Sequence, residues 1–196
     1  LQVIARSAPT LPATAPFNLP ARAPATVRIG IARDEAFGFY YPDDLAALSR
    51  AGAELVPINT LNDAHLPNID GLFIGGGFPE TCMEQLAANA SLRTDIRHAI
   101  DNGLPTYAEC GGLMYLARSL TWNERRADMV GIIPGDIQMH ARPQGRGYVR
   151  LEETVDMPWP ATPGTVSEVA AHEFHYSALT GLDAGARFAF KVLRGT

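Results

Sequence analysis

One cysteine of this chain lies in a sequence context that favours nucleophilic chemistry. Cys110 stands between Glu109 and the pair Gly111-Gly112, directly after the β-prone run 105–108. Glycines on the C-terminal side of such a turn allow the tight backbone geometry that pushes a nucleophile out of a sheet. Where a helix follows at once, its unpaired N-terminal amides stabilise a thiolate. The context predicts a strand-to-helix turn with a thiol at its apex; a small buried cysteine is the alternative.

A thiol nucleophile needs a general base with which to exchange protons. Of the five histidines, three occur in contexts typical of surface or hydrogen-bonded residues, namely a turn, a helix face and a strand end, at His65, His98 and His140. His172 and His175 lie instead in a late, strand-like stretch. Because side chains alternate along a strand, Glu173 and His175 share one face, where the carboxylate could orient the imidazole toward a thiol.

The same stretch does not have the pattern of a metal site. His172 and His175 are three positions apart, whereas the zinc-binding helix of metalloproteases needs four, and no third ligand is apparent in the sequence. We therefore predict no metal.

A run of three glycines follows the strand-like stretch 70–74. Gly75-Gly76-Gly77 lack the Gly-x-Gly-x-x-Gly spacing of a dinucleotide site, but they leave several backbone N–H groups unshielded by side chains.

The first part of the chain alternates strand and helix patterns. Short apolar runs predict strands, at 27–32, 54–58, 70–74 and 105–108. Helical patterns lie between them, over about 43–51, from Pro79 onward and over about 91–101. This alternation predicts an α/β fold with a mostly parallel sheet and helices on both faces.

The pattern changes after Leu120. An apolar stripe predicts that the helix behind Cys110 continues through Leu113, Leu116, Ala117 and Leu120. Beyond it we expect a polar turn at 125–128 and two short strands in 129–140, broken at Pro134-Gly135. A loop at 144–147 and further strands at 148–155, 169–177 and 188–193 complete the prediction of an antiparallel extension.

Composition limits the class of protein. The chain has 196 residues, is 46% hydrophobic and 19% charged, and is long enough for one well-buried core. Its net charge of -5 implies no nucleic-acid surface. The sequence predicts no membrane span, and its two cysteines, Cys82 and Cys110, suit a reducing cytoplasm.

The proline-rich start of the chain is predicted to be an interdomain linker. Five prolines occur at near-regular spacing within residues 1–26, a density that favours an extended, semi-rigid spacer. We expect residues 27–196 to form one domain of a longer polypeptide, truncated at its C-terminus. The single lysine, Lys191, follows Phe190, so this chain contains no Gly-Lys-Ser/Thr of a phosphate-binding P-loop. Any ATP chemistry must come from another segment.

Three blocks of the sequence together resemble a known family. They are Ala108–Tyr115, Gly75–Glu80 and His172–Ser177, and they look like the signature blocks of class I glutamine amidotransferase domains. The closest branch is that of the cobyrinic acid a,c-diamide synthases, which Asp34–Phe37 and Phe39–Tyr41 also match. The likeness runs from about Val27 to the end of the chain. It implies the flavodoxin-like fold of this class.

The resemblance also implies the roles of individual residues. Cys110 is the expected nucleophile and His175 its base, because related branches have a tyrosine at the position of His172. Gly76 and Gly77 with the amide of Gly111 are the expected oxyanion hole. Better-known class I enzymes place a glutamate two residues after the histidine, where this chain has Ser177. Glu173 is therefore only a candidate for the orienting acid.

The function that the resemblance implies is the glutaminase half of an ATP-dependent a,c-diamide synthase of cobalamin biosynthesis. Glutamine is the expected substrate, and its ammonia would amidate carboxylates of a tetrapyrrole. The domain itself would hold no cofactor, because ATP and Mg²⁺ belong to an N-terminal synthetase domain of the same polypeptide. The sequence is compatible with a monomer or a homodimer.

Three other functions remain open at this point. The same chemistry could serve a sirohaem-type tetrapyrrole amidase. A cysteine-dependent hydrolase or protease could use the same architecture, and turnover of glutamine against peptide separates these classes. A non-catalytic glutamine-binding or docking module is the third, although the chain retains both Cys110 and His175.

Overall fold

The computed structural model describes residues 6–9, 23–159 and 168–195. Most of the predicted linker, residues 1–26, lies outside this part of the chain. The first half contains β1 (Val27–Ala32), β2 (Phe37–Phe39), α2 (Pro42–Arg50), β3 (Ala53–Ile58), β4 (Gly71–Ile74), β5 (Gly76–Gly77), a 3-10 turn (Pro79–Cys82), α3 (Met83–Ala88), α4 (Ala90–Asp101) and β6 (Thr106–Ala108). The second half contains α5 (Gly111–Leu116), β7 (Ala117–Trp122), β8 (Arg125–Asp128), β9 (Ile133–Met139), β10 (Gly145–Glu153), β11 (Glu168–His175), β12 (Ser177–Thr180) and β13 (Phe190–Arg194).

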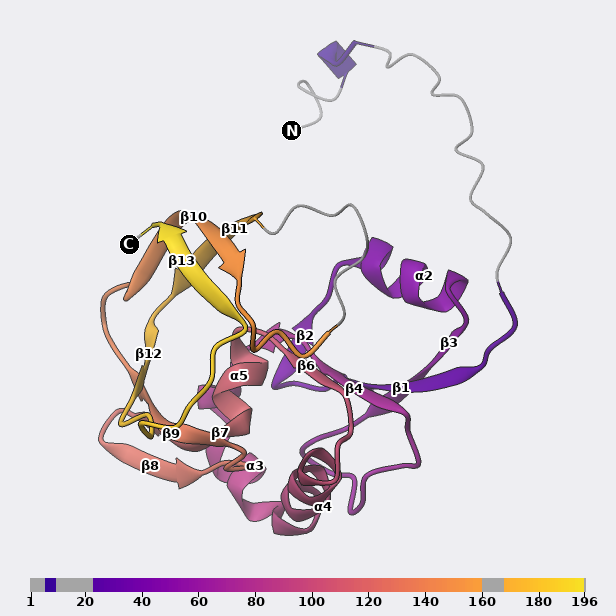
Figure 1. The fold of residues 1–196 in the computed structure, drawn as a ribbon. Helices are drawn as coiled ribbons and strands as arrows, with labels where there is room; N and C mark the ends of the chain where they lie inside the picture. The colour runs from indigo at the N-terminus through magenta and orange to yellow at the C-terminus, as the bar shows by residue number, and fades with distance from the viewer. Residues whose placement is uncertain (1–5, 10–22, 160–167, 196) are drawn as a thin grey trace.

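A four-stranded parallel sheet forms the first layer. Its strands lie in the order β3-β1-β4-β6, with Ile29 of β1 opposite Leu55 of β3 and Gly71 of β4. Helices α2 and α4 cover opposite faces of this sheet (Figure 1). The predicted parallel sheet with helices on both faces is therefore confirmed.

The helices of this layer begin and end at residues that suit those positions. Pro42 occupies the first turn of α2, where its missing N–H costs no hydrogen bond, and Gly52 follows the helix with φ +101°. The side chain of Asn89 caps α4 by accepting from the N–H of Leu92.

The strand order reverses between β1 and β4, and the two loops that follow these strands meet there. They pair as a short antiparallel ladder, in which Phe37 of β2 lies opposite Gly77 and Phe39 opposite Gly76 of β5. In open α/β sheets the crevice at such a reversal is where ligands bind. The fold thus brings the glycine run to the ligand-binding edge of the sheet.

The second half of the chain forms two smaller sheets. One has the order β12-β9-β7-β8 and the other the order β11-β10-β13. All their pairs are antiparallel except β7 with β9, which is parallel. The predicted extension is thus antiparallel in most, but not all, of its pairs.

Several local predictions in this half are wrong. The helix behind Cys110 ends at Leu116, and residues 117–122 form β7, because Ala117–Trp122 pair with strands on both sides. The polar turn expected at 125–128 is strand β8; the turn lies before it, at Asn123 and Glu124, whose φ values are +49° and +62°. Pro134-Gly135 do not break β9, and the loop expected at 144–147 is mostly the start of β10.

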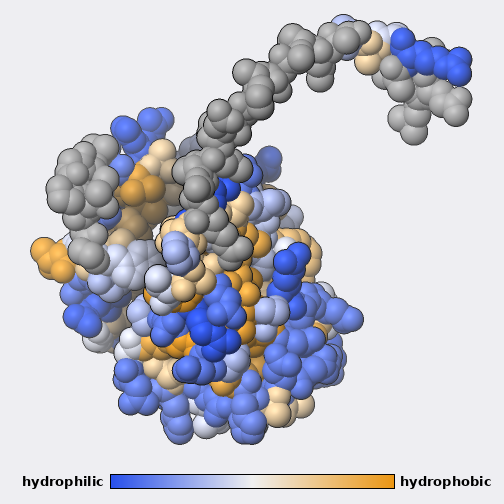
Figure 2. Space-filling model, turned by 90° about the vertical axis from the view of Figure 1, so that its right-hand side faces the viewer, coloured by the Kyte–Doolittle hydropathy of each residue, from blue (hydrophilic) through white to orange (hydrophobic). Residues whose placement is uncertain are grey.

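One hydrophobic core spans the parallel sheet, α3 to α5 and the sheet β12-β9-β7-β8, which we call the mixed sheet because it contains one parallel pair. Its largest fully buried side chains include Phe37, Ile74, Leu86, Tyr115, Leu120 and Ile137. The α2 side of the sheet is less covered: no residue of α2 is fully buried, and a cavity of about 710 Å³ opens beside Leu48, Phe73 and Trp159. On the side shown in Figure 2, apolar side chains reach the surface within an otherwise polar face. Within the described residues, no helix has the length and apolar character to cross a membrane.

Candidate functional site

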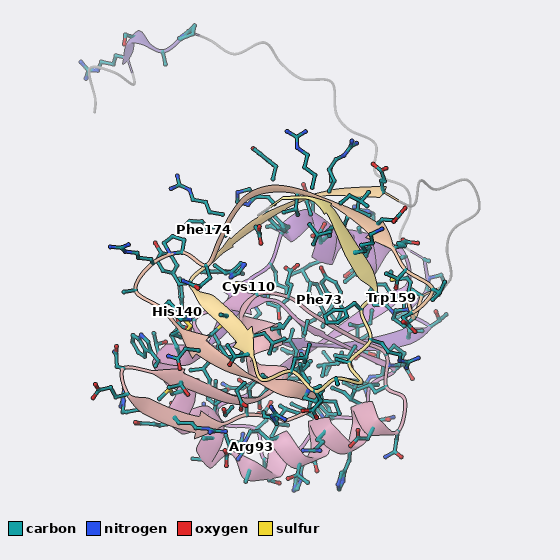
Figure 3. The ribbon with its side chains drawn as sticks, turned by 60° about the vertical axis from the view of Figure 1, so that its left-hand side comes forward. Phe73, Arg93, Cys110, His140, Trp159 and Phe174 are labelled. Atoms are coloured by element: carbon teal, nitrogen blue, oxygen red, sulfur yellow. The ribbon has the colours of Figure 1, made fainter. Side chains whose placement is uncertain are left out.

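Cys110 occupies the turn between β6 and α5, as the sequence predicts. Its backbone has φ +51° and ψ −112°, a conformation that residues with a side chain rarely adopt, and its side chain is exposed. Strained backbone of this kind occurs at functional sites because the surrounding structure holds it in place. The turn therefore presents the thiol to solvent at the ligand-binding edge of the sheet (Figure 3).

Glycine is required at the positions that support this turn. A Cβ atom on Gly112 would overlap the carbonyl oxygen of Ile74, and one on Gly111 would come within 2.9 Å of the backbone nitrogen of Gly77. The loop after β4 therefore packs directly against the start of α5. Only residues without a side chain allow this approach.

The glycine run lies beside the cysteine. A Cβ atom on Gly76 would stand 3.6 Å from the Cβ of Cys110, and one on Gly77 would overlap the carbonyl oxygen of Ala36. Gly76, Gly77 and Gly111, which the resemblance implies as oxyanion donors, thus gather around Cys110.

A tyrosine hydroxyl holds the start of the glycine run. The Tyr40 hydroxyl accepts from the N–H of Gly75 at 3.0 Å and donates to the carbonyl of Ala32 at the end of β1. Burial raises the pKa of Tyr40 to about 12, so the hydroxyl stays protonated. In the sequence Tyr40 stands out only as a member of the block Phe39–Tyr41, and the pairing of β2 with β5 brings it to Gly75.

His175 has a hydrogen-bond acceptor within reach of each ring nitrogen. Its Nδ1 lies 2.8 Å from the carbonyl oxygen of Ser177, and its Nε2 lies 3.3 Å from Oε2 of Glu173. Because a carbonyl only accepts, Nδ1 carries the proton in the bond to Ser177, and Nε2 of the neutral ring is the basic nitrogen. Nε2 donates to the Glu173 carboxylate only when the ring is protonated, as an imidazolium. The expected pairing of Glu173 with His175 is present, but at Nε2; the acceptor at Nδ1 is the backbone of Ser177.

Gly145 is a site residue that was not predicted from the sequence. It pairs with His175 across β10 and β11, and a Cβ atom there would overlap Nε2 of His175 and come within 2.5 Å of Oε2 of Glu173. The only feature of the sequence that distinguishes Gly145 is its place in Gly145-Arg-Gly147, which predicts a loop but no contact with a histidine.

The cysteine and the histidine are not bonded to each other. Across the described residues, no hydrogen bond joins the thiol of Cys110 to the ring of His175. Catalytic hydrogen bonds are often long without substrate and tighten only in its complex. The missing bond is therefore compatible with His175 acting as the base of Cys110.

The other histidines have different surroundings. His65 pairs with Asp95 at 2.9 Å, and that hydrogen bond lowers the pKa of the Asp95 carboxyl. His172 packs edge-on against Tyr148, with ring centroids 5.4 Å apart. The ranges that the structure describes hold no group of three or more His, Cys, Asp or Glu side chains that could bind a metal.

Comparison with solved structures shows the class of fold. A crystal structure of a glutamine amidotransferase superposes with a TM-score of 0.58 at 17% identity, over 83% of this chain and 79% of that one. A putative GMP synthase protein from Thermoplasma acidophilum gives 0.55 at 17% identity, over 85% and 73%. The fold is that of the class I glutamine amidotransferases.

Comparison of sequences narrows this class to one family. Residues 28–196 match the CobB/CobQ-like glutamine amidotransferase domain, and the chain belongs to that family. A cobyrinate a,c-diamide synthase of Magnetococcus marinus is 45% identical over 202 residues, covering 100% of this chain and 43% of the relative. That of Archaeoglobus fulgidus is 45% identical over 173 residues, covering 86% and 36%. The resemblance is confirmed, and the chain spans less than half the length of these relatives.

Proposed function

We propose that this chain hydrolyses glutamine and passes the ammonia to an ATP-dependent synthetase part of the same polypeptide. The observation that carries the proposal is the exposed thiol of Cys110, held at φ +51° beside the backbone of Gly76. A nucleophile on a strained turn next to unshielded amides suits attack on a carbonyl carbon.

In the first step the Cys110 thiolate attacks the side-chain amide carbon of glutamine, forming the Sγ–C bond. The negative charge moves to the amide oxygen, where N–H groups of Gly76, Gly77 and Gly111 stabilise it. Removing one donor of this kind from an oxyanion hole slows catalysis about a hundredfold or more.

His175 moves the protons. Its Nε2 takes the thiol proton and gives it to the departing nitrogen, so that ammonia leaves and a glutamyl thioester remains. Nε2 then takes a proton from water, whose oxygen attacks the thioester carbon. The Sγ–C bond breaks, glutamate leaves, and the proton returns to the thiol. Glu173 lies where it stabilises the imidazolium form of His175 during these steps.

The larger reaction is the amidation of tetrapyrrole carboxylates. The curated relatives of Magnetococcus marinus and Archaeoglobus fulgidus are called cobyrinate a,c-diamide synthases. We propose that the remaining part of the polypeptide binds ATP and Mg²⁺, activates two carboxylates of cobyrinic acid and receives the ammonia, as a step of cobalamin biosynthesis. Two free thiols suit the cytoplasm as its place.

The test is glutamate release by the full-length polypeptide, with Cys110→Ser beside the wild type. The matched control is Cys82→Ser, since Cys82 is a half-buried cysteine whose sulfur lies 3.7 Å from the Thr81 hydroxyl. We expect Cys110→Ser to abolish release and Cys82→Ser to keep it. A folded wild type that releases no glutamate, with or without ATP and acceptor, would overturn the proposal in favour of a binding module.

The acceptor needs a separate measurement. Amide formation on cobyrinic acid is compared with that on a sirohaem-type tetrapyrrole, each with ATP, Mg²⁺ and glutamine. Amidation of the sirohaem-type compound alone would keep the glutaminase and replace the proposed acceptor.

A further inference from the structure

Strands β10 and β11 present two different faces. Their antiparallel register places Arg146 opposite Phe174 and Tyr148 opposite His172 on one face, while Gly145 lies opposite His175 on the other. We call the first of these the outer face, made of Arg146, Tyr148, Arg150, Ala170, His172 and Phe174. All six residues are exposed, whereas Glu173 and His175 on the inner face are partly buried.

The outer face is unusually rich in exposed aromatic surface. Tyr148 is 87% exposed and Phe174 is 54% exposed. The ring of Tyr148 packs edge-on against His172, and that of Phe174 packs edge-on against Tyr176, with centroids 5.7 Å apart. These contacts hold the rings in place without covering them. Large aromatic side chains left exposed in fixed positions are typical of a surface that a partner covers.

The six residues of the outer face include two arginines and no acid, although the chain as a whole carries −5. The two glutamates next along the same side of the strands, Glu152 and Glu168, each pair with a cation. Arg150 forms a loose ion pair with Glu168 at 3.5 Å. Within the described residues, Arg146 makes no ion pair, and neither do two neighbouring arginines, Arg142 at the approach to β10 and Arg194 opposite Arg150 on β13. Guanidinium groups with no internal partner favour acidic groups from outside the domain.

The same two strands also carry the proposed base. Glu173 and His175 alternate with His172 and Phe174 along β11, so a partner on the outer face contacts the same strand that carries the proposed base on its opposite face.

We infer that the outer face is the surface on which the ATP-dependent synthetase part docks, through an acidic patch. This inference rests on the proposed function, which requires such a part in the same polypeptide. The cores of protein interfaces are enriched in Tyr, Phe and Arg, the residue types that Tyr148, Phe174 and Arg146 bring to this face. The curated relatives are long enough to contain such a part, since this chain covers only 43% and 36% of their length.

A small ligand fits this face less well than a protein does. Small-molecule sites are concave and bury most of the ligand, whereas Tyr148 projects from an open sheet face. The docked part would neutralise the free guanidinium groups and cover the rings together.

The experiment measures coupling in the full-length polypeptide, as amide formed per glutamate released. The variants are Arg146→Glu and Tyr148→Ala; the control is Arg97→Glu, a half-exposed arginine on α4. We expect both variants to keep glutamate release and to lower the ratio of amide to glutamate about tenfold, the size of effect typical of interface anchors. Amidation with added ammonium salt should be unchanged, because the synthetase part is intact.

The outcomes separate the two proposals. Glutamate release absent from the wild type overturns the proposed function. Normal release in the wild type with normal coupling in both variants overturns only the docking surface. A change in oligomeric mass of Arg146→Glu by light scattering, with coupling unchanged, identifies a second copy of this chain as the occupant instead. Loss of coupling in Arg97→Glu as well would also contradict a surface confined to the outer face.

Discussion

Residues without functional groups shape the site as much as those that carry the chemistry. Gly145 leaves the space in which the His175 ring lies, and Gly112 does the same for the carbonyl of Ile74 behind Cys110. At both positions the required property is the absence of a Cβ atom.

Replacing Gly145 tests this directly. In Gly145→Ala the new methyl group must displace Nε2 of His175, so we expect glutamate release to fall about a hundredfold, as for other small misplacements of catalytic groups. The KM for glutamine should change little. The control is Gly185→Ala, where a Cβ atom meets nothing within 4 Å. Equal activity of both variants in steady-state assays would contradict the close contact.

The sequence predicts the turn that exposes Cys110 and the glycine run after β4 well, because Glu-Cys-Gly-Gly and Gly-Gly-Gly are local patterns whose backbone consequences are direct. It identifies His175 only as a residue on a strand, with Glu173 on the same face. The bond from Nδ1 to the carbonyl of Ser177 could not be predicted, since it depends on how the chain bends between β11 and β12.

At the scale of elements, the Tyr40 hydroxyl links the end of β1 to the loop after β4. Removing it in Tyr40→Phe leaves the N–H of Gly75 without its acceptor and loosens the glycine run. We expect kcat for glutamine hydrolysis to fall about tenfold to a hundredfold with little change in KM. Tyr41→Phe is the control, since Tyr41 is 74% exposed. A change in KM alone would argue against a role in positioning the oxyanion donors.

The same tyrosine makes a prediction about alkaline pH. Its pKa is raised from 10.0 in the unfolded chain to about 12 in the folded one, so the folded state keeps a proton that the unfolded state loses. Its contribution to stability is complete below pH 10 and is lost as the pH rises from 10 to 12. Denaturant unfolding at pH 9 and pH 11 should show a smaller loss for Tyr40→Phe than for the wild type. Identical losses would contradict the buried hydroxyl.

The elements that the sequence mispredicts lie where pairing overrides local pattern. Leu113, Leu116, Ala117 and Leu120 have helical spacing, yet Ala117 and Leu120 are buried in β7, because β8 and β9 pair with it on both sides. The parallel sheet, by contrast, is visible in the sequence as short apolar runs that alternate with helical patterns. Nothing in a single sequence reveals that β7 and β9 run parallel, since this pairing is non-local.

For the molecule as a whole, Asp136 is the centre of a polar cluster on the mixed sheet. Its carboxylate accepts from the Ser119 hydroxyl at 2.7 Å and from Arg118 at 3.1 Å, and Arg118 also reaches Asp183 and the carbonyl of Gly181. The cluster therefore ties β7 and β9 to the loop after β12.

This cluster predicts how stability depends on acid. The hydrogen bond from Ser119 and the charge of Arg118 lower the pKa of Asp136 below its unfolded value of 3.8. Its contribution is complete above that value and is lost as the pH falls through the lower, folded pKa. Asp136→Asn should be less stable than the wild type in urea at pH 7, by a margin that narrows by pH 3. A margin that stays constant across this range would contradict an ionised Asp136 in the cluster.

The carbonyl at Ser177 has a consequence for genetics. If His175 is oriented by a backbone oxygen, no substitution of a side chain removes that acceptor, and Ser177→Ala leaves it in place. An alanine scan would then find Cys110 and His175 indispensable, whereas in a hydrolase with a catalytic triad it finds three such side chains. The third member would be the backbone carbonyl of Ser177. Its position depends on the path of the main chain, so a search for conserved side chains would not find it.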